Sequence, residues 1–295
     1  MTLSRAEILR LLRDNSLSPS RALGQNFVAD ANTVRRIARI AGVGPGDLVV
    51  EVGAGLGSLT LALAETGARV LAIEKDRWLA PVLRRVLATH PEAAGTRLAE
   101  ADAMVIDWGT ILVPSRGWAL VANLPYNIAT PLVADLLDRV PAIERMVVLV
   151  QEEVARRLVA RPGEPAYGAV SVKVAYWAQA SWKGTVPSSV FVPRPKVGSA
   201  LVSLQRRSVP AVDPAIVPPE LLFGLVRAGF ATRRKMLRRA LADLVPPSAF
   251  ASAGIDPCAR AEQLGVSEWG RLAAALGATG RVTPTAAELP PGTDR

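Results

Sequence analysis

The chain has 295 residues, of which 50% are hydrophobic and 21% are charged, a composition that supports a packed core and excludes global disorder. A single cysteine, Cys258, excludes an intramolecular disulfide, and a single histidine, His90, excludes a His-cluster metal site and a Ser-His triad elsewhere in the chain. The formal net charge of +9 suggests an anionic partner, although a basic surface that only maintains solubility gives the same value.

The first 47 residues carry helix-type patterns interrupted at LSPSRALGQNFVAD, so residues 1–47 are predicted to form a helical segment with a loop. The opening MTLSRAEILRLLRD has charges throughout, unlike the apolar segment of a signal peptide. No stretch approaches the roughly 18 consecutive apolar residues that a membrane-spanning helix needs. We therefore expect a soluble, cytoplasmic protein.

From residue 48 onward, short apolar runs rich in β-branched residues alternate with helix-length segments. The expected strands are residues 48–52, 69–73, 97–101, 118–122 and 145–150. Strands that alternate with helices predict a mainly parallel sheet with both faces covered, which is the α/β class. Two later runs, residues 169–177 and 200–205, are predicted to be further strands in a hairpin or an antiparallel edge.

After a Pro-rich stretch at residues 209–220 the pattern is helical only, so this stretch is the predicted domain boundary. The expected division is an α/β domain at 48–208 followed by a small all-helical domain at 209–280. Residues 281–295 are rich in Pro, Thr and Gly with little to bury, so we expect a disordered tail there.

The sequence VVEVGAGLGSLTLAL places Gly53, Gly55 and Gly57 at a strand-to-helix turn, where glycines allow positive φ and the close approach of a ligand. The dinucleotide fingerprint is G-x-G-x-x-G, whereas this chain has G-x-G-x-G. The tighter loop suits a ligand without a diphosphate. A purely structural turn is the alternative for these glycines taken alone.

Acidic residues follow the next two predicted strands. Glu74 ends LAIE about 20 residues after Gly53, at a position where an acid can accept both ribose hydroxyls. Asp102, in AEADAM, offers an acceptor for an adenine amino group. Taken alone, Glu74 reads as a solvated acid and Asp102 as a helix cap. Together with the glycine loop, they give the layout of a Rossmann-like methyltransferase that uses S-adenosyl-L-methionine.

The fourth strand leads into Asn-Leu-Pro-Tyr, residues 123–126, at the same edge. A nucleobase amine is a poor nucleophile because its lone pair is delocalised into the ring. The Asn123 side-chain oxygen and the Leu124 carbonyl are candidate acceptors for its two hydrogens, which would aim the lone pair at a methyl sulfonium. Pro125 fixes φ and removes a competing donor, and Tyr126 is a candidate stacking ring. The alternative is an asparagine cap before a structural turn, with Tyr126 as ordinary packing.

Seven motifs resemble those of the ribosomal RNA adenine N6-dimethyltransferases. They are QNF (25–27), EVGAGLGSLT, EKD, DAM (102–104), NLPYNIATPL, FVPRPKVGS (191–199) and FATRRKMLRRAL (230–241), in the family's order. The resemblance implies methyl transfer from S-adenosyl-L-methionine to N6 of two adjacent adenosines in the 3′-terminal hairpin loop of 16S rRNA. The implied partner is 16S rRNA or a small-subunit precursor. We expect no metal, no membrane partner and a monomeric protein.

The resemblance also assigns residues. It implies that Asn26 and Val28 cover the methionine end of the cofactor. The remaining cofactor contacts it implies are Gly53, Gly55, Glu74, Asp102 and Asn123. Phe191 would close the target-base pocket opposite Tyr126, although core packing at the start of a strand explains it equally well. The chain departs from the family's frequent residues at Val28, Ala101 and Gly198.

Basic residues concentrate between positions 227 and 239, a stretch with no acidic residue. They are Arg227, Arg233, Arg234, Lys235, Arg238 and Arg239. On a single helix, Arg234 and Arg238 would share a face and hold RNA phosphates, with affinity falling as salt rises. A solvated charge run is the alternative. A hairpin loop is the cheaper RNA target because the substrate adenine must leave its stack.

Three other functions share parts of this pattern. A resistance-type enzyme acting on 23S rRNA would carry the same motifs up to the basic stretch. A DNA adenine methyltransferase would more often have Pro-Pro where this chain has Leu124 and Pro125. An assembly or transcription factor could keep the fold and bind RNA without catalysis, although the intact cofactor loop and Asn123 favour an enzyme.

Overall fold

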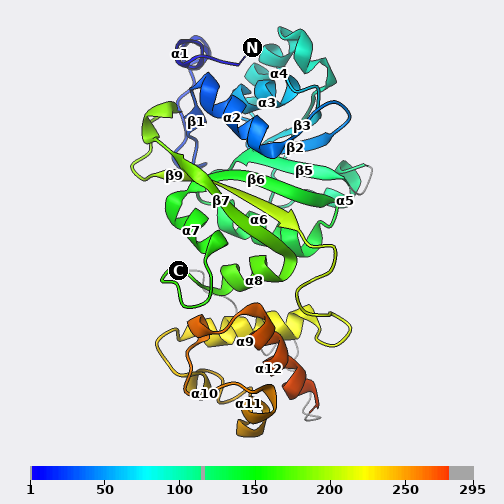
Figure 1. Ribbon diagram of the computed structural model, residues 1–295. Helices are drawn as coiled ribbons and strands as arrows, with labels where there is room; N and C mark the ends of the chain where they lie inside the picture. The colour runs from blue at the N-terminus through cyan, green and yellow to red at the C-terminus, as the bar shows by residue number, and fades with distance from the viewer. Residues whose placement is uncertain (1, 114–116, 279–295) are drawn as a thin grey trace. The chain divides into compact units, whose positions relative to one another are not determined.

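The computed structural model describes residues 2–113 and 117–278 (Figure 1). The chain divides into two compact units. The first contains Met1–Ala155 and Ala180–Arg206, and the second contains Arg156–Gln179 and Arg207–Arg295. The chain therefore leaves the first unit at residue 156, returns at 180 and leaves again at 207, whereas the sequence pattern suggested one boundary after residue 208. The proposed tail at 281–295 lies outside the described residues.

A seven-stranded sheet forms the centre of the first unit, in the order β4-β3-β2-β5-β6-β9-β7. Its strands are β2 (Leu48–Val52), β3 (Arg69–Glu74), β4 (Arg97–Glu100), β5 (Trp118–Asn123), β6 (Ile143–Gln151), β7 (Ala178–Val186) and β9 (Ser199–Arg206). Strands β2 to β6 are parallel where they pair, and β9 runs antiparallel to β6. The predicted α/β class and the antiparallel addition near residue 200 are confirmed.

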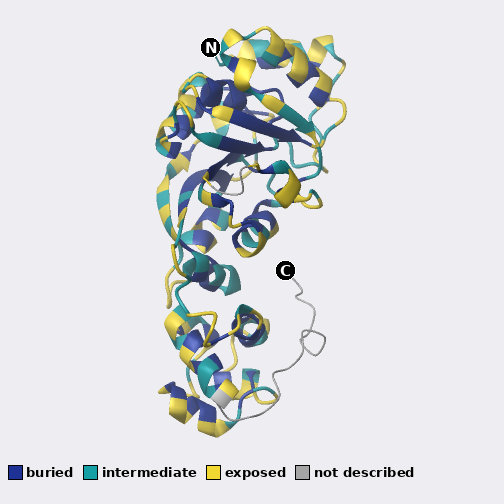
Figure 2. Cartoon of the chain, turned by 90° about the vertical axis from the view of Figure 1, so that its right-hand side faces the viewer, coloured by how far each residue is buried: buried dark blue, intermediate teal, exposed yellow. Residues whose placement is uncertain are grey.

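Helices cover this sheet, and its central strands β2, β3 and β5 are buried (Figure 2). The helices are α1 (Arg5–Asp14), α2 (Ala31–Ala41), α3 (Ser58–Ala64), α4 (Ala80–Ala88), α5 (Trp108–Ile111), α6 (Ala129–Arg139) and α7 (Glu152–Val159). Helix α2 shows why they form. Asp30 caps its first turn by accepting from the Thr33 amide, and Val34 and Ile37 lie on one buried face that packs on the strands.

A second, two-stranded sheet brings distant segments together. Strand β1 (Phe27–Val28) pairs antiparallel with β8 (Phe191–Val192), with Phe27 opposite Val192 and Val28 opposite Phe191. A short 3₁₀ turn, η2 (Ser188–Val190), precedes β8, and another, η1 (Pro91–Gly95), precedes β4. The QNF and FVPRP motifs are therefore neighbours in the fold.

The prediction of a strand at residues 169–177 is wrong, because this segment is helix α8 (Ala169–Trp177). The Ser171 hydroxyl accepts from the Gly168 amide at the N-terminus of the helix, and Val172 and Tyr176 are buried four residues apart. An apolar run rich in valine fits a strand and a buried helix equally well by pattern alone. The strand itself, β7, begins one residue after the helix ends.

The second unit is helical, as predicted for the C-terminal part of the chain. Besides α8 it contains α9 (Pro219–Ala231), α10 (Leu237–Ala240), α11 (Pro247–Ala253), the 3₁₀ turn η3 (Ala261–Gln263) and α12 (Val266–Ala278). Its own core includes Tyr176, Phe223, Phe250 and Trp269, all buried. None of the described helices is long and apolar enough to cross a membrane.

Candidate active site

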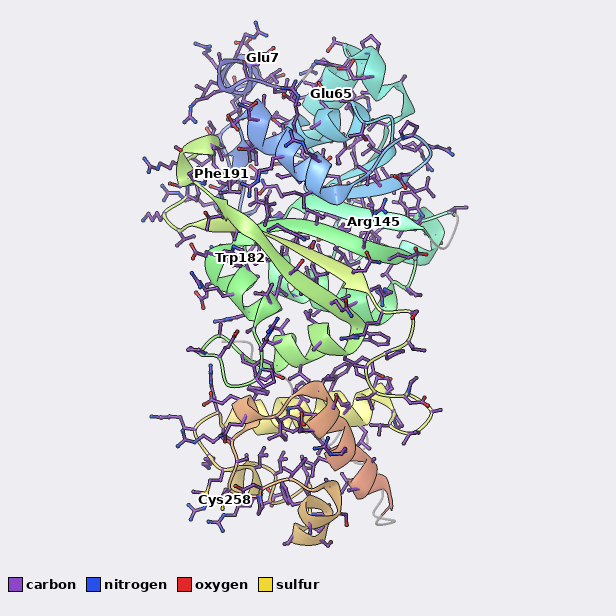
Figure 3. All side chains as sticks on the ribbon, in the orientation of Figure 1. Glu7, Glu65, Arg145, Trp182, Phe191 and Cys258 are labelled. Carbon is purple, nitrogen blue, oxygen red and sulfur yellow. The ribbon has the colours of Figure 1, made fainter. Side chains whose placement is uncertain are left out.

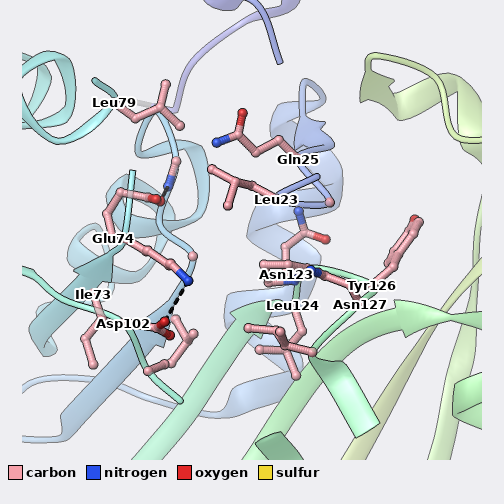
Figure 4. Close-up of a pocket in the computed structure, with 18 of the residues that line it drawn as sticks. Leu23, Gln25, Ile73, Glu74, Leu79, Asp102, Asn123, Leu124, Tyr126 and Asn127 are labelled. Atoms are coloured by element: carbon pink, nitrogen blue, oxygen red, sulfur yellow. Dashed lines mark hydrogen bonds and ion pairs between the residues drawn. The ribbon is translucent and has the colours of Figure 1, made fainter. Parts of the chain in front are cut away.

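A cavity opens at the carboxyl ends of β2, β3 and β5, where the strand order changes direction (Figure 4). It encloses about 830 Å³ when the open space at its mouth is counted. The predicted residues that line it are Asn26, Gly53, Gly55, Glu74, Asp102, Asn123, Leu124, Pro125 and Tyr126. Such a crevice beyond the strand ends is where open α/β sheets bind ligands.

The glycine loop needs its glycines for two reasons. Gly53 and Gly55 have φ angles of 73° and 59°, which side chains rarely adopt. A Cβ atom on Gly55 would also lie 2.9 Å from the Phe27 ring, and one on Gly53 would lie 3.2 Å from Cδ of Pro125. The loop is therefore in close contact with both the QNF and the NLPY motifs.

Glu74 is only 6% exposed and holds the glycine loop in place. Its Oε2 accepts from the Gly55 amide at 2.7 Å, and its Oε1 accepts from the Asp76 amide at 2.8 Å. Burial raises the pKa of Glu74, and these two amides oppose that rise. This buried position on the cavity wall is unlike the solvated acid that was the alternative.

Asp102 lies at the neighbouring strand end and is paired with Lys75, at 2.6 Å from Nζ to Oδ2. Its Oδ1 accepts from the Met104 amide at 2.9 Å. The hydrogen bond from Lys75 is the main cause that lowers the pKa of Asp102. Asp102 is therefore an ionised acceptor at the rim of the cavity, and Lys75 joins the loops that follow β3 and β4.

The Asn123 amide has a defined orientation. Its Nδ2 donates to the backbone carbonyl of Asn26 at 2.8 Å. Because a carbonyl oxygen only accepts hydrogen bonds, the amide nitrogen must face Asn26, and Oδ1 is left as the acceptor on the other side of the group. An asparagine held in this way can accept a hydrogen from an amine in the cavity.

The rest of the motif forms a turn that leads into α6. The Leu124 amide donates to the Leu149 carbonyl at 3.1 Å, and the Ile128 amide donates to the Pro125 carbonyl at 3.1 Å. The Tyr126 hydroxyl lies 2.7 Å from Oγ of Ser199, at the start of β9. Burial raises the pKa of Tyr126, against the effect of this hydrogen bond. The hydroxyl is held by Ser199 while the ring lines the cavity.

Two residues implied by the resemblance lie elsewhere. Phe191, labelled in Figure 3, has an exposed fraction of 0% and packs in the core of the first unit, and it does not line the cavity. Val28, its partner across the β1–β8 pair, is also buried in that core. The structure thus favours core packing for Phe191, and the residue of β1 that reaches the cavity is Phe27.

A second buried acid lies on β2. Glu51 is 2% exposed, and its Oε2 has no hydrogen-bond partner among the described residues. Burial raises the pKa of Glu51 to about 8, and the charge of Glu74 acts in the same direction. Glu51 does not line the cavity. Glu51 precedes the glycine loop by two residues, and with this raised pKa it is mainly protonated at neutral pH.

The six basic residues proposed for RNA are all exposed on the second unit. The prediction that Arg234 and Arg238 share a helix face is wrong, because α9 ends at Ala231 and α10 begins only at Leu237. The intervening Met236 has extended backbone and bridges to Arg260, which prevents one continuous helix. Arg233 is also held by Glu262 at 2.6 Å and by the Pro165 carbonyl at 2.7 Å.

Sequence reasoning missed several supporting residues. Gln25 donates to Oδ2 of Asp76 at 2.7 Å, and this bond joins the QNF loop to the loop after β3. Lys75 belongs to the EKD motif and Ser199 to the FVPRPKVGS motif. The motifs do not predict that these residues bind Asp102 and Tyr126. Arg260 is exposed beside Met236, more than 20 positions from the basic stretch in sequence, and no local pattern links the two.

Comparison with known proteins identifies relatives along most of the chain. The sequence model of the family described as "Ribosomal RNA adenine dimethylase" matches residues 18–276. Curated relatives named "Ribosomal RNA small subunit methyltransferase A" include that of Thermobifida fusca, 47% identical over 92% of this chain and 95% of its own length. That of Streptomyces griseus is 48% identical over 91% of this chain and 93% of its own length.

Two solved structures share the fold over most of their length. The 23S rRNA methyltransferase ErmE is 29% identical with a TM-score of 0.66, covering 85% of this chain and 99% of its own. A dimethyladenosine transferase from Plasmodium falciparum has a TM-score of 0.71 at 21% identity, covering 85% of this chain and 97% of its own. The second likeness shows the fold alone.

Proposed function

The chain belongs to the ribosomal RNA adenine dimethylase family, and on that premise we propose that it dimethylates N6 of two adjacent adenosines in the 3′-terminal hairpin loop of 16S rRNA. It is an rRNA adenine N6,N6-dimethyltransferase whose activity is linked to maturation of the small subunit. The proposed place of action is the cytoplasm, where that precursor is assembled.

The proposed cofactor is S-adenosyl-L-methionine, which supplies an electrophilic methyl group on a sulfonium. The residues of the cavity fit it. We assign Glu74 to the ribose hydroxyls and Asp102 to an adenine amino group, and their positions on the cavity wall at neighbouring strand ends support this assignment. Gly53 and Gly55 leave the loop backbone open to close approach, and Asn26, which also lines the cavity, is the proposed contact of the methionine end.

The orientation of Asn123 is the observation that carries the catalytic proposal. With Nδ2 fixed on the Asn26 carbonyl, Oδ1 accepts one hydrogen of the adenine amine, and the Leu124 carbonyl accepts the other. These bonds turn the nitrogen lone pair away from the ring and toward the methyl group. Tyr126 stacks on the adenine, with its hydroxyl held by Ser199. Orientation then supplies most of the rate enhancement.

The second unit supplies the proposed grip on RNA. Exposed cations at Arg227, Arg234, Lys235, Arg238 and Arg239 would neutralise phosphates, and Arg260 extends the same group beside Met236. A target adenine in a hairpin loop is already weakly stacked, so little energy is needed to move it into the cavity.

Action on large-subunit rRNA is the second candidate, supported by the likeness to ErmE. The small-subunit relatives are nevertheless 47–48% identical to this chain, against 29% for ErmE, and they favour the 16S substrate. A noncatalytic assembly role would not explain why the Asn123 amide is held with its oxygen free to accept a hydrogen bond.

Radiolabelled methyl transfer from S-adenosyl-L-methionine tests the proposal. Unmethylated small subunits, protein-free large-subunit rRNA and adenine-rich DNA are offered in parallel, and the products are digested and identified by mass. N6,N6-dimethyladenosine from small subunits alone is the expected result. Label in large-subunit rRNA supports the second candidate. If none of the three substrates is labelled while the protein still binds the cofactor and the small subunit, the proposed catalytic activity is wrong and an assembly role is favoured.

A further inference from the structure

A cation and an exposed aromatic ring stand together on the loop that follows β3. Trp78 is 63% exposed, although a tryptophan side chain is usually largely buried. The Arg77 guanidinium carbon lies 4.8 Å from the centre of the Trp78 ring, which is a cation–π distance. The guanidinium therefore covers one face of the indole.

This loop is anchored to the cavity rather than loose. The Trp78 amide donates to Oδ1 of Asp76 at 2.9 Å, while the other oxygen of Asp76 accepts from Gln25 in the cavity wall. Leu79, the next residue, is buried and lines the cavity. The ring therefore has a fixed base at the mouth of the site.

A second loop, the one after β4, also carries exposed apolar side chains. Met104 and Val105 are both exposed, and the ion pair between Lys75 and Asp102 joins their loop to that of Trp78. Of the nine large hydrophobic side chains that are exposed in the described residues, three lie in these two loops. Single exposed hydrophobics are common on protein surfaces, and the neighbouring guanidinium of Arg77 is what distinguishes Trp78 from them.

Among the described residues, no ion pair joins Arg77 to an acid, so its guanidinium is available to a phosphate. Asp76 is occupied by the Trp78 amide and Gln25, Asp102 is paired with Lys75, and Glu100 is paired with Arg84. The acids around Arg77 are thus committed to other groups. An exposed ring beside a cation is the combination that binds single-stranded nucleic acid, because bases stack on the ring and phosphates contact the cation.

We propose that Trp78 and Arg77 form a stacking platform for an unpaired base of the RNA substrate, at the mouth of the cofactor cavity and on the catalytic unit itself. The inference rests on the proposed function for the identity of the RNA. The platform would contact an unpaired base and its phosphate. This contact is separate from the pocket for the target adenine and from the basic residues of the helical unit.

The test compares Trp78→Ala and Trp78→Phe with Leu9→Ala, a matched truncation of an exposed hydrophobic side chain on α1 of the same unit. The readouts are the affinity for an unstructured adenine-rich RNA oligonucleotide, the KM for small subunits and the Kd for S-adenosyl-L-methionine. Trp78→Ala should weaken oligonucleotide binding and raise the KM at least about fivefold, the lower end for a base–aromatic stack. Trp78→Phe should recover most of the loss, and cofactor Kd should stay within about twofold of wild type.

Three results would overturn the platform. Equal RNA affinity in Trp78→Ala and Leu9→Ala would show that the ring is ordinary surface. A parallel loss of cofactor affinity would show that Trp78 acts through Asp76 and the cavity wall. A loss seen with small subunits but not with the oligonucleotide would show that Trp78 contacts folded rRNA or a ribosomal protein and not an unpaired base. If wild type binds the oligonucleotide through Trp78 yet methylates no rRNA, the platform stands and the proposed function fails.

Discussion

The side-chain nitrogen of Asn123 donates to the backbone carbonyl of Asn26 at 2.8 Å, and this bond joins the end of a central strand to the N-terminal loop of the cavity. Asn123→Ala removes both this bond and the proposed acceptor for the adenine amine. We expect single-turnover methyl transfer to fall about 100-fold or more, the scale of a small misplacement of reacting groups.

Asn127→Ala is the matched control for that substitution. Asn127 belongs to the same turn and also donates to the N-terminal loop, at 3.3 Å to the Ala22 carbonyl, but it lies beyond the strand end. The single-turnover rate of methyl transfer in Asn127→Ala should stay within about tenfold of the wild-type rate. Equal losses in the two variants would mean that the tether to the loop matters, and not the Asn123 oxygen.

Glu74→Gln replaces one carboxylate oxygen with a nitrogen that cannot accept the amide of Gly55 or Asp76. We expect calorimetric affinity for S-adenosyl-L-methionine to fall at least about tenfold, the loss expected for a hydrogen bond to a charged group. Glu100→Gln, at the end of the next strand, should leave the affinity unchanged. An unaltered Kd in Glu74→Gln would reject the ribose assignment.

The Tyr126 ring and its hydroxyl make separable contributions. Tyr126→Phe loses only the bond to Ser199, worth about 1 kcal/mol or roughly fivefold in rate, whereas Tyr126→Ala loses the stacking ring and should cost up to about 100-fold. Ser199→Ala should match Tyr126→Phe, and the double variant should be no worse than either single one. Additive losses in steady-state kinetics would show that the two groups act independently.

Glu51 gives the stability a pH dependence of defined sign. Its carboxyl ionises near 4.5 in an unfolded chain and near 8 in the folded protein. Between these values the folded state holds more protons, so the free energy of unfolding falls as pH rises, by at most about 1.4 kcal/mol per pH unit. Melting temperatures of Glu51→Gln should therefore decline less than those of wild type from about pH 5 to pH 8. Parallel curves would contradict the raised pKa.

The two neighbouring arginines of the second unit should differ in RNA binding. Arg234→Gln should lower the slope of log affinity against log salt by about one, as expected for a lost phosphate contact. Arg233→Gln should change it less, because Glu262 already neutralises Arg233. Filter binding to 16S rRNA across a salt series measures both slopes. A larger effect of Arg233→Gln would mean that RNA displaces Glu262.

The sequence was sufficient to place Glu74, Asp102 and Asn123 at one edge, because the ends of parallel strands must lie side by side. It was insufficient where a pattern fits two structures, as at residues 169–177, whose valine-rich run is a helix. It also could not reveal contacts between side chains from separate elements. The Tyr126–Ser199 bond and the Met236–Arg260 bridge depend on the packing of segments that no local period relates.

The pairing of β1 with β8 can form only late in the synthesis of the chain. Phe27 helps to line the cavity, yet its strand partner, Val192, is translated only after most of the first unit has emerged. Non-local pairings of this kind carry a large loop-closure entropy and form late. A nascent chain stalled before residue 191 should therefore bind S-adenosyl-L-methionine poorly, even with its glycine loop, Glu74 and Asn123 already made.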